Sequence, residues 1–511
     1  MSSTLPIIPI RWRRPDENTL YENVYKHGTP NFHPFPTVTD VVCAAHCPLA
    51  ILHSLLHGQR EPLTETRAQH LRLGYKIGNI FHDFIAHLKT RALLDNIRFT
   101  DMSQIRREFE DFTRYRGIND RAKRNVWEYY LRPWCERKLD ELGNLISSSS
   151  RIFFEVQVGN AYVSFRTPSG GSVSYPLLGR IDEVDIDNRK IIERTSMGLP
   201  NETDPPRLKD FQIWLLWKTL IGIPRSRLPS FFRGINFRNF ELVVETPYRD
   251  FYVDKDDYRY ETLTHQAYTW IHDVFFERRV YHEAYLNRSC TYSNQIENCG
   301  FRLACYGRRG RRPYREARDE MRREFRAFYL HLAYELLWSQ HLFRYQLTML
   351  SEDELENLGR IALGRVISYQ NDRIEIRLER TGMNNLLSKR ESGEIGGYSI
   401  VVGTPLCGVK IFGYPESFYQ DRVVLRLRQD FITPSETATL LVTDPEAVAF
   451  TEEPWFLVEN IQRNLFSLET WGKIKDDTAE NDPTVRFIEA LFGTRRVRPE
   501  GGGGSTHDTN R

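Results

Sequence analysis

The sequence predicts an α/β fold with helical flanks, followed by a small closed or half-closed β-barrel. Residues 39–145 carry apolar side chains at helical spacing. From residue 151 to about residue 285, short β-branched and aromatic segments alternate with helical ones, which is typical of a sheet covered by helices. Residues 355–445 contain alternating strands with turns between them and no long helix, a pattern that favours a barrel.

The bulk composition narrows the class of protein. At 511 residues the chain exceeds what one ordinary core supports, so we expect about two or three domains. The net charge of +2 carries no information about nucleic acid. No run of about 18 apolar residues is present and the first apolar stretch is too short for a signal peptide, so we expect a cytoplasmic protein without membrane contact. In that reducing compartment, seven cysteines favour a metal or cluster over disulfides.

The expected helices begin after an N-terminal stretch rich in proline. A Thr-Asp start and a terminal glycine delimit a first helix over residues 39–58. A second helix is expected over about 66–94 and more helix to about residue 145, interrupted by Pro133.

Four short segments predict three or four strands of a central sheet, because they are β-branched or aromatic and are separated by glycine, serine and Asp-Asn pairs. They cover residues 153–158, 161–165, 172–187 and 190–196. The elements expected after them are a helix over 209–222, a strand pair over 240–248 and 249–254, and a long helix over about 261–285.

Two acidic residues lie on neighbouring expected strands. One strand brings Asp182 to its end, an Asp-Asn turn follows, and the next strand carries Glu193. Two carboxylates on a hairpin can converge within a few ångströms, which suits a hard divalent cation such as Mg²⁺. His82, on the helix before the sheet, is a third candidate ligand, and Gly78 one turn earlier would allow close approach. Taken singly, each residue is more often structural, and their order is what favours a site.

That order resembles a known nuclease family. A helical G-x-x-x-H covers residues 78–82, G-R-I-D covers 179–182, Ile-Ile-Glu ends a strand at 191–193, and a helix carrying Gln212 follows. The pattern is similar to the RecB-type branch of the PD-(D/E)XK nucleases, whose core is an α/β restriction-endonuclease-like fold. The resemblance implies a phosphodiester hydrolase that acts on DNA.

The resemblance also implies roles for individual residues. It makes His82, Asp182 and Glu193 ligands of Mg²⁺ or Mn²⁺, and it makes Gln212 a residue that positions DNA or a lysine. The catalytic candidates are Asp182, Glu193, Arg194 and Gln212.

The motif lysine of the family is missing. It lies two residues after the metal-binding glutamate, where this chain has Thr195, with Arg194 between them. Alternation along a strand would point Arg194 away from Glu193, whereas a bulge would turn it inward. Lys190 or Lys209 could also reach the site from elsewhere. The sequence leaves these alternatives open. It therefore also leaves open whether the site is catalytically active.

Four cysteines bracket the same part of the chain. Cys47 lies in the first helix, and Cys290, Cys299 and Cys305 lie in a later cysteine-rich segment. Four thiolates suit a tetrahedral Zn²⁺ or a [4Fe–4S] cluster. The paired C-x-x-C knuckles that are typical of zinc modules are absent from the sequence.

This cysteine pattern resembles a subset of the RecB-type nucleases. In that subset, which includes the CRISPR-associated exonucleases, the AddB subunit and the nuclease domain of the eukaryotic replication helicase–nuclease, one cysteine precedes the histidine motif and three follow the glutamine helix. The resemblance implies a structural [4Fe–4S] cluster on Cys47, Cys290, Cys299 and Cys305. Cys43, on the same helix face as Cys47, is a rival ligand. We interpret Cys135 and Cys407 as small buried apolar residues.

A basic segment follows the last of these cysteines. Ten arginines lie between Arg302 and Arg326. Arginine pairs bidentately with phosphate and stacks on bases, which favours DNA binding near the start of this segment. Acidic residues interleave after Glu316, where a solvated helix face is an equal alternative. The candidate DNA-binding residues are Arg308, Arg309, Arg311 and Arg312.

These patterns divide the chain into five expected parts. They are an N-terminal arm (1–36), a PD-(D/E)XK nuclease-like domain with an iron–sulfur cluster (37–312), a basic connecting helix (313–350), an OB-like β-barrel (351–475) and a disordered polar tail (476–511).

The function expected from the resemblance is a metal-dependent DNA nuclease, directed at single strands or ends, with a structural [4Fe–4S] cluster. No GxxxxGK[ST] loop is present, so a separate helicase or translocase is the expected partner. The alternative is a catalytically degenerate DNA-binding subunit of a helicase–nuclease complex. DNA repair, CRISPR adaptation and antiviral defence are all open as pathways.

Overall fold

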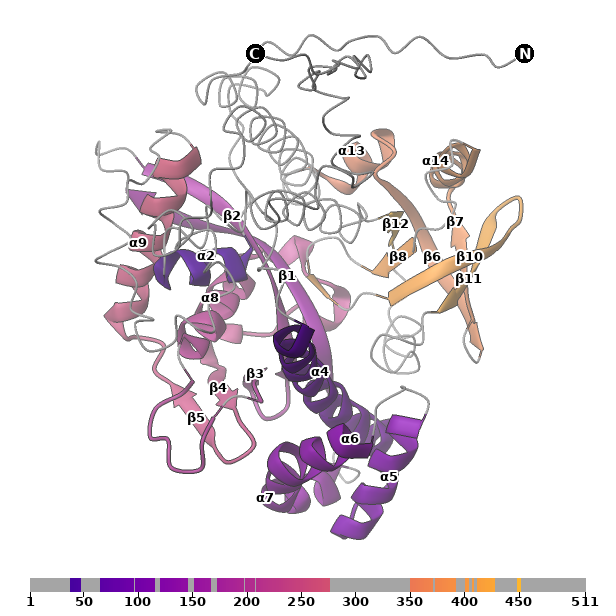
Figure 1. Ribbon diagram of the computed structural model, residues 1–511. Coiled ribbons are helices and arrows are strands. Elements are labelled where there is room, and N and C mark those ends of the chain that lie inside the picture. The colour runs from indigo at the N-terminus through magenta and orange to yellow at the C-terminus, as the bar shows by residue number, and fades with distance from the viewer. Residues whose placement is uncertain are drawn as a thin grey trace, which may run out of the picture.

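The computed structural model describes residues 37–46, 65–95, 97–114, 120–145, 151–166, 172–196, 198–206, 208–275, 350–370, 373–391, 400–403, 407–408, 411–427 and 448–451. These residues form two separate β-sheets with helices around them (Figure 1), so the expected mixed α/β content is confirmed. The expected N-terminal arm and polar tail, and the expected connecting helix up to residue 349, lie outside the described residues.

The first sheet has six strands in the order β5-β4-β3-β2-β1-β9, of which β3 and β4 run parallel and the other neighbours antiparallel. The strands are β1 (Ile152–Arg166), β2 (Ser172–Asp185), β3 (Lys190–Arg194), β4 (Glu241–Glu245), β5 (Asp250–Val253) and β9 (Cys407–Gly408). The segments expected as two strands over 153–158 and 161–165 form one strand, because the chain passes Gly159 with a register shift instead of a turn.

The second sheet comes from the later part of the chain. Its strands pair in the order β10-β11-β7-β6-β12-β8, and β8 also pairs with β10, so the pairings return on themselves. The strands are β6 (Ile361–Gln370), β7 (Arg373–Leu378), β8 (Ile400–Gly403), β10 (Ile411–Phe418), β11 (Arg422–Leu427) and β12 (Val448–Thr451). Between β8 and β10 the chain contributes β9 to the edge of the first sheet, where it pairs with β1.

A helix interrupts the strands of the second sheet, where the sequence analysis expected none. Helix α14 (Arg380–Glu391) lies between β7 and β8, and it buries Met383 and Leu386 against the sheet. These apolar residues recur at helical and not at strand spacing, which explains the difference. Helix α13 (Glu352–Asn357) precedes the sheet and begins with a capping box between Ser351 and Glu354.

The first sheet is flanked by helices that all lie before residue 276. They are α2 (Val38–His46), α4 (Glu65–Leu94), α5 (Met102–Arg114), α6 (Asp120–Val126), the π-helix η1 (Trp127–Leu131), α7 (Arg132–Asn144), α8 (Lys209–Gly222), the short 3-10 turns η3 (Arg225–Arg227), η4 (Ser230–Phe232) and η5 (Phe237–Asn239), and α9 (Tyr258–Phe275). The start of α2 differs from the expected Thr39-Asp40. Thr37 caps this helix, because its hydroxyl accepts a hydrogen bond from the Asp40 N–H while the Asp40 carboxylate accepts one from the Thr37 N–H.

Helix α8 lies at the centre of the main core. Its sequence, KDFQIWLLWKTLIG, is apolar on nearly every side, as expected of a helix that is buried all round. It packs on β1, β2 and β4, and α2 and α9 lie beside it on the same side of the sheet (Figure 1).

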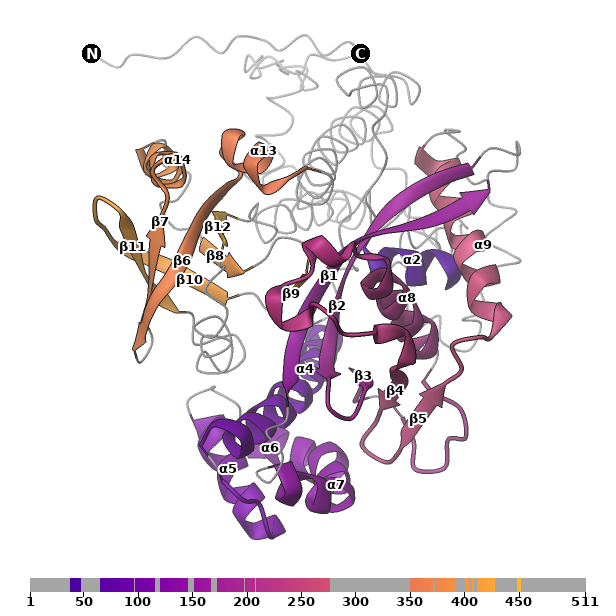
Figure 2. The same ribbon diagram turned by 180° about the vertical axis from the view of Figure 1, so that it is seen from behind.

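A second core lies on the other side of β1. Ile152 and Phe154 pack there against helices α4 to α7, whereas Phe153 and Val156 pack into the main core. In Figure 2 helix α4 passes behind β1 and β2, opposite α8. The sheet is therefore covered on both faces, and the long helix α4 crosses it where β2 approaches β3.

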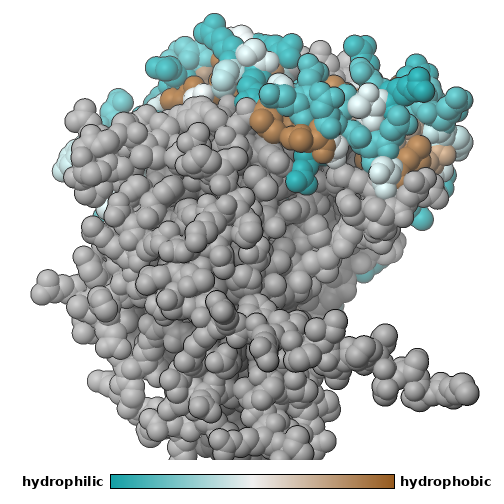
Figure 3. All heavy atoms as spheres, turned by 90° about the horizontal axis from the view of Figure 1, so that it is seen from above, coloured by the Kyte–Doolittle hydropathy of each residue, from teal (hydrophilic) through white to brown (hydrophobic). Residues whose placement is uncertain are grey.

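The described part of one face of the molecule is mainly polar. On the face shown in Figure 3, the coloured side chains are mostly hydrophilic and the hydrophobic ones form small separate groups. In the part of the chain that the structure describes, no helix combines the length and the apolar character needed to cross a membrane.

Gly179, in the G-R-I-D segment, is expected to tolerate no larger side chain. A Cβ at this position would lie 2.4 Å from Leu216 Cδ2 of α8 and 2.7 Å from Val38 Cγ2 of α2. Gly179→Ala should therefore lower the free energy of unfolding by about 1–3 kcal/mol, measured by urea denaturation, because the packed side chains of Leu216 and Val38 must shift to make room.

Gly78→Ala is the matched control. A Cβ at Gly78 would meet only Ser196 Oγ, at 3.6 Å, which is ordinary contact. Close approach is therefore not the reason for this glycine, contrary to the expectation from the sequence. The control should be as stable as the wild type or more stable by up to about 1 kcal/mol, since alanine favours helix. Equal destabilisation of both variants would contradict the packing argument.

Candidate functional site

Five side chains from four elements meet where β2 separates from β3. The pairing of these strands ends at Glu183 and Ile192, and the next residues beyond this last pair are Asp182 on β2 and Glu193 on β3. Helix α4 brings His82 to this point, and the first turn of α8 brings Lys209 and Gln212. The two carboxylates, Asp182 and Glu193, complete the set.

Asp182 is held by one helix and one strand. Its Oδ2 lies 3.3 Å from His82 Nδ1, and the same oxygen accepts a hydrogen bond of 2.6 Å from the backbone N–H of Arg194. Burial opposes the ionisation of Asp182, but the positive charges of His82 and Lys209 and these hydrogen bonds hold its pKa well below the usual range. In the same way burial opposes the protonation of His82, but the charge of Asp182 raises the pKa of the imidazole. The pair is therefore an ionised carboxylate beside a readily protonated histidine.

Glu193 is held by two side chains of α8. Its Oε1 accepts hydrogen bonds from Lys209 Nζ at 2.9 Å and from Gln212 Nε2 at 2.6 Å. The amide oxygen of Gln212 in turn accepts a hydrogen bond from Lys209 Nζ at 3.0 Å. The three side chains form a closed triangle, in which each fixes the direction of the other two.

The second oxygen of Glu193 has no such support. The side chain is 3% exposed, and its Oε2 is buried without a hydrogen-bond partner among the described residues. Burial, reinforced by the negative charge of Asp182, raises the pKa of Glu193 to about 7, although Lys209 opposes the shift. An unsatisfied buried carboxylate oxygen next to an ionised one is an arrangement that a cation would stabilise.

Lys209 is a lysine that contacts Glu193 directly, from a helix and not from the strand. Thr195, in the motif position, donates its backbone N–H to the carbonyl of Glu245 in β4. Lys209 instead reaches Glu193 from the first residue of α8, where the preceding Leu208 adopts a left-handed conformation with φ 62°. Of the alternatives that the sequence left open, the structure brings Lys209 into the site.

The side chain of Arg194, expected among the catalytic candidates, does not point toward Glu193. Its side chain donates to the carboxylates of Glu183 in β2 and Glu245 in β4, the latter at 2.8 Å from Nε. Both partners are completely buried. The physical reason is the alternation of a strand, which points Arg194 to the side opposite Glu193. Arg194 therefore contacts Asp182 through its backbone N–H, and its guanidinium contacts buried carboxylates on the other side of β3.

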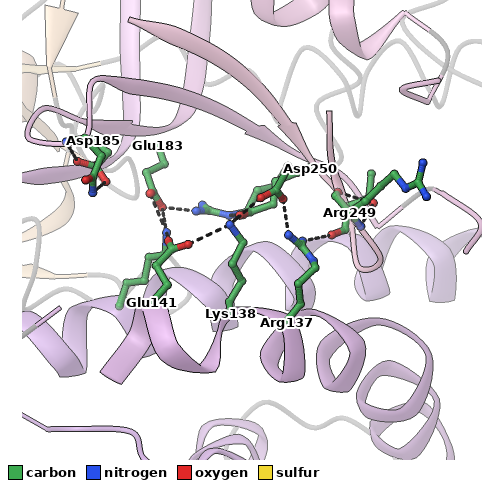
Figure 4. Close-up of polar contacts among 12 residues, drawn as sticks. Arg137, Lys138, Glu141, Glu183, Asp185, Arg249 and Asp250 are labelled. Atoms are coloured by element: carbon green, nitrogen blue, oxygen red, sulfur yellow. Dashed lines mark hydrogen bonds and ion pairs between the residues drawn. The ribbon is translucent and has the colours of Figure 1, made fainter. Parts of the chain in front are cut away.

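The partners of Arg194 belong to a buried ionic network (Figure 4). Lys89 of α4 lies 2.8 Å from Glu183, and Lys138 of α7 lies 3.2 Å from Glu245. Lys138 also contacts Asp250 at 2.8 Å and Glu141 at 3.0 Å. The network joins the two helices to four strands of the sheet. It fixes the position of α4, the helix that carries His82.

Glu155 is a site residue that sequence reasoning missed. It lies on β1 opposite Asp182, between the paired positions Phe154–Glu183 and Val156–Ile181, and its own pairing is broken. Its φ of 52° is in the left-handed region, which is strained for a residue with a side chain. Its Oε2 lies 2.5 Å from Arg180 Nε. No sequence motif marks Glu155, because it occupies an ordinary polar position in a strand.

The suitability of the site for a metal rests on its oxygen donors. Among the described residues, no three His, Cys, Asp or Glu side chains are already arranged as ligands of one ion. Asp182 and the unsupported Oε2 of Glu193 are carboxylate oxygens, the donors that Mg²⁺ and Mn²⁺ prefer. Two carboxylates are the usual protein contribution to a Mg²⁺ site, since this ion keeps several waters. The donor set fits such an ion.

Several expected site residues lie outside the described part of the chain. They are the cluster candidates Cys47, Cys290, Cys299 and Cys305 and the arginines Arg308, Arg309, Arg311 and Arg312. The side chain of the rival ligand Cys43 and that of Cys407 are also not described. Cys135 is a free thiol buried completely in the second core, as expected.

Two comparisons with known proteins give no match. No protein-family model matches the chain, and a search of curated proteins finds no match.

Glu155 should make the stability of the protein depend on pH when divalent ions are absent. Burial, with the charge of Asp182 added, raises the pKa of Glu155 to about 7 from 4.5. A carboxyl with a raised folded-state pKa supports folding below pH 4.5 and loses that support as the pH rises to 7. Glu155→Gln should therefore be more stable than the wild type at pH 8 by about 2–3 kcal/mol and equal to it at pH 4.

Urea denaturation in EDTA measures this difference. Glu110→Gln is the control, because Glu110 is 63% exposed and pairs only weakly with Arg106 on the surface of α5. It should show no difference from the wild type at either pH. A Glu155→Gln curve that follows the wild type across this range would contradict the assignment of a buried carboxyl.

Proposed function

We propose that this chain is a metal-dependent DNA nuclease with a PD-(D/E)XK-type active site, in which Lys209 replaces the missing strand lysine. The observation that carries the proposal is the contact of 2.9 Å between Lys209 Nζ and Glu193 Oε1. It places an ammonium group beside the second acidic residue, which is where the family has one, although it comes from a helix and not from the strand.

The acidic residues have separate roles in this proposal. Asp182, Glu193 and His82 would hold Mg²⁺ or Mn²⁺, and such an ion, when bound, polarises the phosphodiester and lowers the pKa of a bound water. Asp182 is ready for this role because it is ionised well below neutral pH. Glu193 would use its unsupported Oε2, since Lys209 and Gln212 occupy Oε1.

Lys209 acts as a cation and not as a base. Burial favours its neutral form, but the charges of Glu193 and Asp182 outweigh burial and raise the pKa of the ammonium group. A permanent ammonium beside the attacked phosphate stabilises the negative charge that grows on the phosphoryl oxygens. Gln212 orients both Lys209 and Glu193, so it is a positioning residue.

The finer description of the fold belongs to the same proposal. The first sheet with α2, α4 and α8 would be an α/β restriction-endonuclease-like core, and the second sheet an OB-like β-barrel. The ring of strand pairings and the position of the acidic residues on β2 and β3 support it. A separate helicase would supply strand separation, since the sequence contains no phosphate-binding loop of a motor.

Cleavage of labelled single-stranded DNA with Mn²⁺ or Mg²⁺ tests the function. Asp182→Ala and Glu193→Ala should abolish cleavage, and Lys209→Met should lower the rate about 10²–10³-fold, the usual effect of removing one charge-stabilising donor. Lys190→Met is the matched control and should cleave like the wild type. Lys190 lies at the start of β3, about 10 Å from Glu193 along the strand.

Two results would overturn the proposal. Cleavage that survives in all three site variants would place the activity elsewhere. Wild-type protein that binds DNA but cleaves it with neither ion would favour the degenerate DNA-binding subunit.

The four-cysteine cluster is a separate part of the proposal and is supported by the sequence pattern. If Cys47, Cys290, Cys299 and Cys305 hold a [4Fe–4S] cluster, protein purified without oxygen should be brown and absorb at about 400 nm. Replacing any one of the four cysteines by serine should bleach this absorption, whereas Cys135→Ser should leave it unchanged. A colourless wild-type protein containing stoichiometric zinc would exclude the cluster.

A further inference from the structure

One face of the second sheet carries a concentration of arginines. The four strands β6, β7, β10 and β11 contain five arginines and two acidic residues, Glu375 and Glu416. The neighbours of the arginines along β7 and β11, such as Ile376 and Val423, are completely buried, so alternation places the arginines outside. This arginine face consists of Arg365, Arg373, Arg377, Arg422 and Arg426.

The arginines form rows across the strands. Arg365 of β6 is directly opposite Arg377 of β7, and Arg377 is directly opposite Arg422 of β11. About 13 Å further along the strands, Arg373 is opposite Arg426. Like charges at directly paired positions destabilise a sheet. A face that keeps two such rows has a reason other than stability, and binding of a polyanion supplies one.

The acidic residues nearby neutralise the face only in part. Arg422 pairs with Glu375 at 2.7 Å, Arg373 pairs with Glu416 at 2.6 Å, and Arg377 lies 3.5 Å from Asp421. Arg365 is exposed and forms no ion pair with any described residue. Ion pairs at such exposed positions contribute about 0–1 kcal/mol, so phosphate groups can replace them at little cost.

Two exposed aromatic rings adjoin the rows. Tyr414 of β10 is directly opposite Arg426, and its side chain continues the second row. Tyr419 is 50% exposed, and the guanidinium of Arg422 lies 4.9 Å from the centre of its ring. Exposed tyrosines stack on unpaired bases, whose faces are hidden in a duplex. Arginine rows with adjoining tyrosines therefore favour a single strand over a double one.

We propose that the arginine face binds single-stranded DNA, with Arg365 and Arg377 on phosphates and Tyr414 stacked on a base. The inference takes from the proposed function only that the polyanion is DNA. It concerns a surface on the second sheet, separate from the candidate active site on the first. The surface would hold the substrate strand while the active site acts on it.

Fluorescence anisotropy with the full chain tests the proposal. The probe is a labelled oligothymidine longer than the about 4–16 nucleotides that one such surface covers, in EDTA so that no cleavage occurs. Arg365→Gln/Arg377→Gln should weaken binding about tenfold. It should also lower the slope of log K against log salt by about 1.4, from two phosphate contacts. Tyr414→Ala should weaken binding of the oligothymidine more than binding of a duplex of equal length.

Arg106→Gln/Arg107→Gln on α5 is the matched control, because it removes the same charge from another exposed surface. Its affinity and salt slope should stay at the wild-type values. An unchanged salt slope in the Arg365/Arg377 variant, or an equal loss of affinity in the control, would contradict DNA binding by the arginine face.

The two proposals fail in distinguishable ways. If wild-type protein cleaves DNA but the Arg365/Arg377 variant binds normally, the proposed DNA binding by the arginine face is wrong and the nuclease activity is supported. If that variant loses affinity while the wild type cleaves nothing, DNA binding by the arginine face is supported and the proposed nuclease activity is wrong.

Discussion

A buried arginine in the middle of the first sheet holds the candidate site together. The Arg194 guanidinium bonds Glu183 of β2 and Glu245 of β4, so one cation joins three adjacent strands. Both carboxylates are completely buried, and loss of a buried partner typically costs about 3–5 kcal/mol because a bare charge is left behind. The backbone N–H of the same residue bonds Asp182, and the preceding residue is Glu193. The position of Arg194 thus determines where both acidic residues of the site lie.

The ionic network extends this constraint to the helices. Lys89 ties α4 to Glu183, and His82 lies seven residues, about two turns, earlier on the same helix. Arg137 and Lys138 of α7 both reach Asp250 at the start of β5. The helices of the second core therefore matter for the candidate site, because α4 places His82 beside Asp182. Such a network gives little net stability compared with apolar packing, and its value lies in one fixed arrangement.

The site itself brings three carboxyl groups together in a buried place. Asp182 is ionised, whereas burial raises the pKa values of Glu193 and Glu155 to about 7. Positive charge stabilises these carboxylates, and the chain provides it through His82 beside Asp182 and Lys209 beside Glu193. What matters for phosphodiester chemistry is the place of the ammonium group, not the element that carries it. In the proposed nuclease, a lysine at the start of α8 would satisfy this requirement as well as one on β3.

The sequence by itself determined the α/β character, the strands that carry Asp182 and Glu193, and the helices that carry His82 and Gln212. It could do so because these features are written in local periodicity and in the order of short motifs. It did not reveal α14, whose helical spacing is brief, or the strained Glu155, which occupies an ordinary polar position. Only the tertiary structure decided that Lys209 is the lysine that contacts Glu193, and that the Arg194 side chain points away from Glu193. The place of the Arg194 side chain depends on the side of β3 that it faces. The place of Lys209 depends on where the first turn of α8 lies beside β3. Contacts between elements distant in the sequence set both.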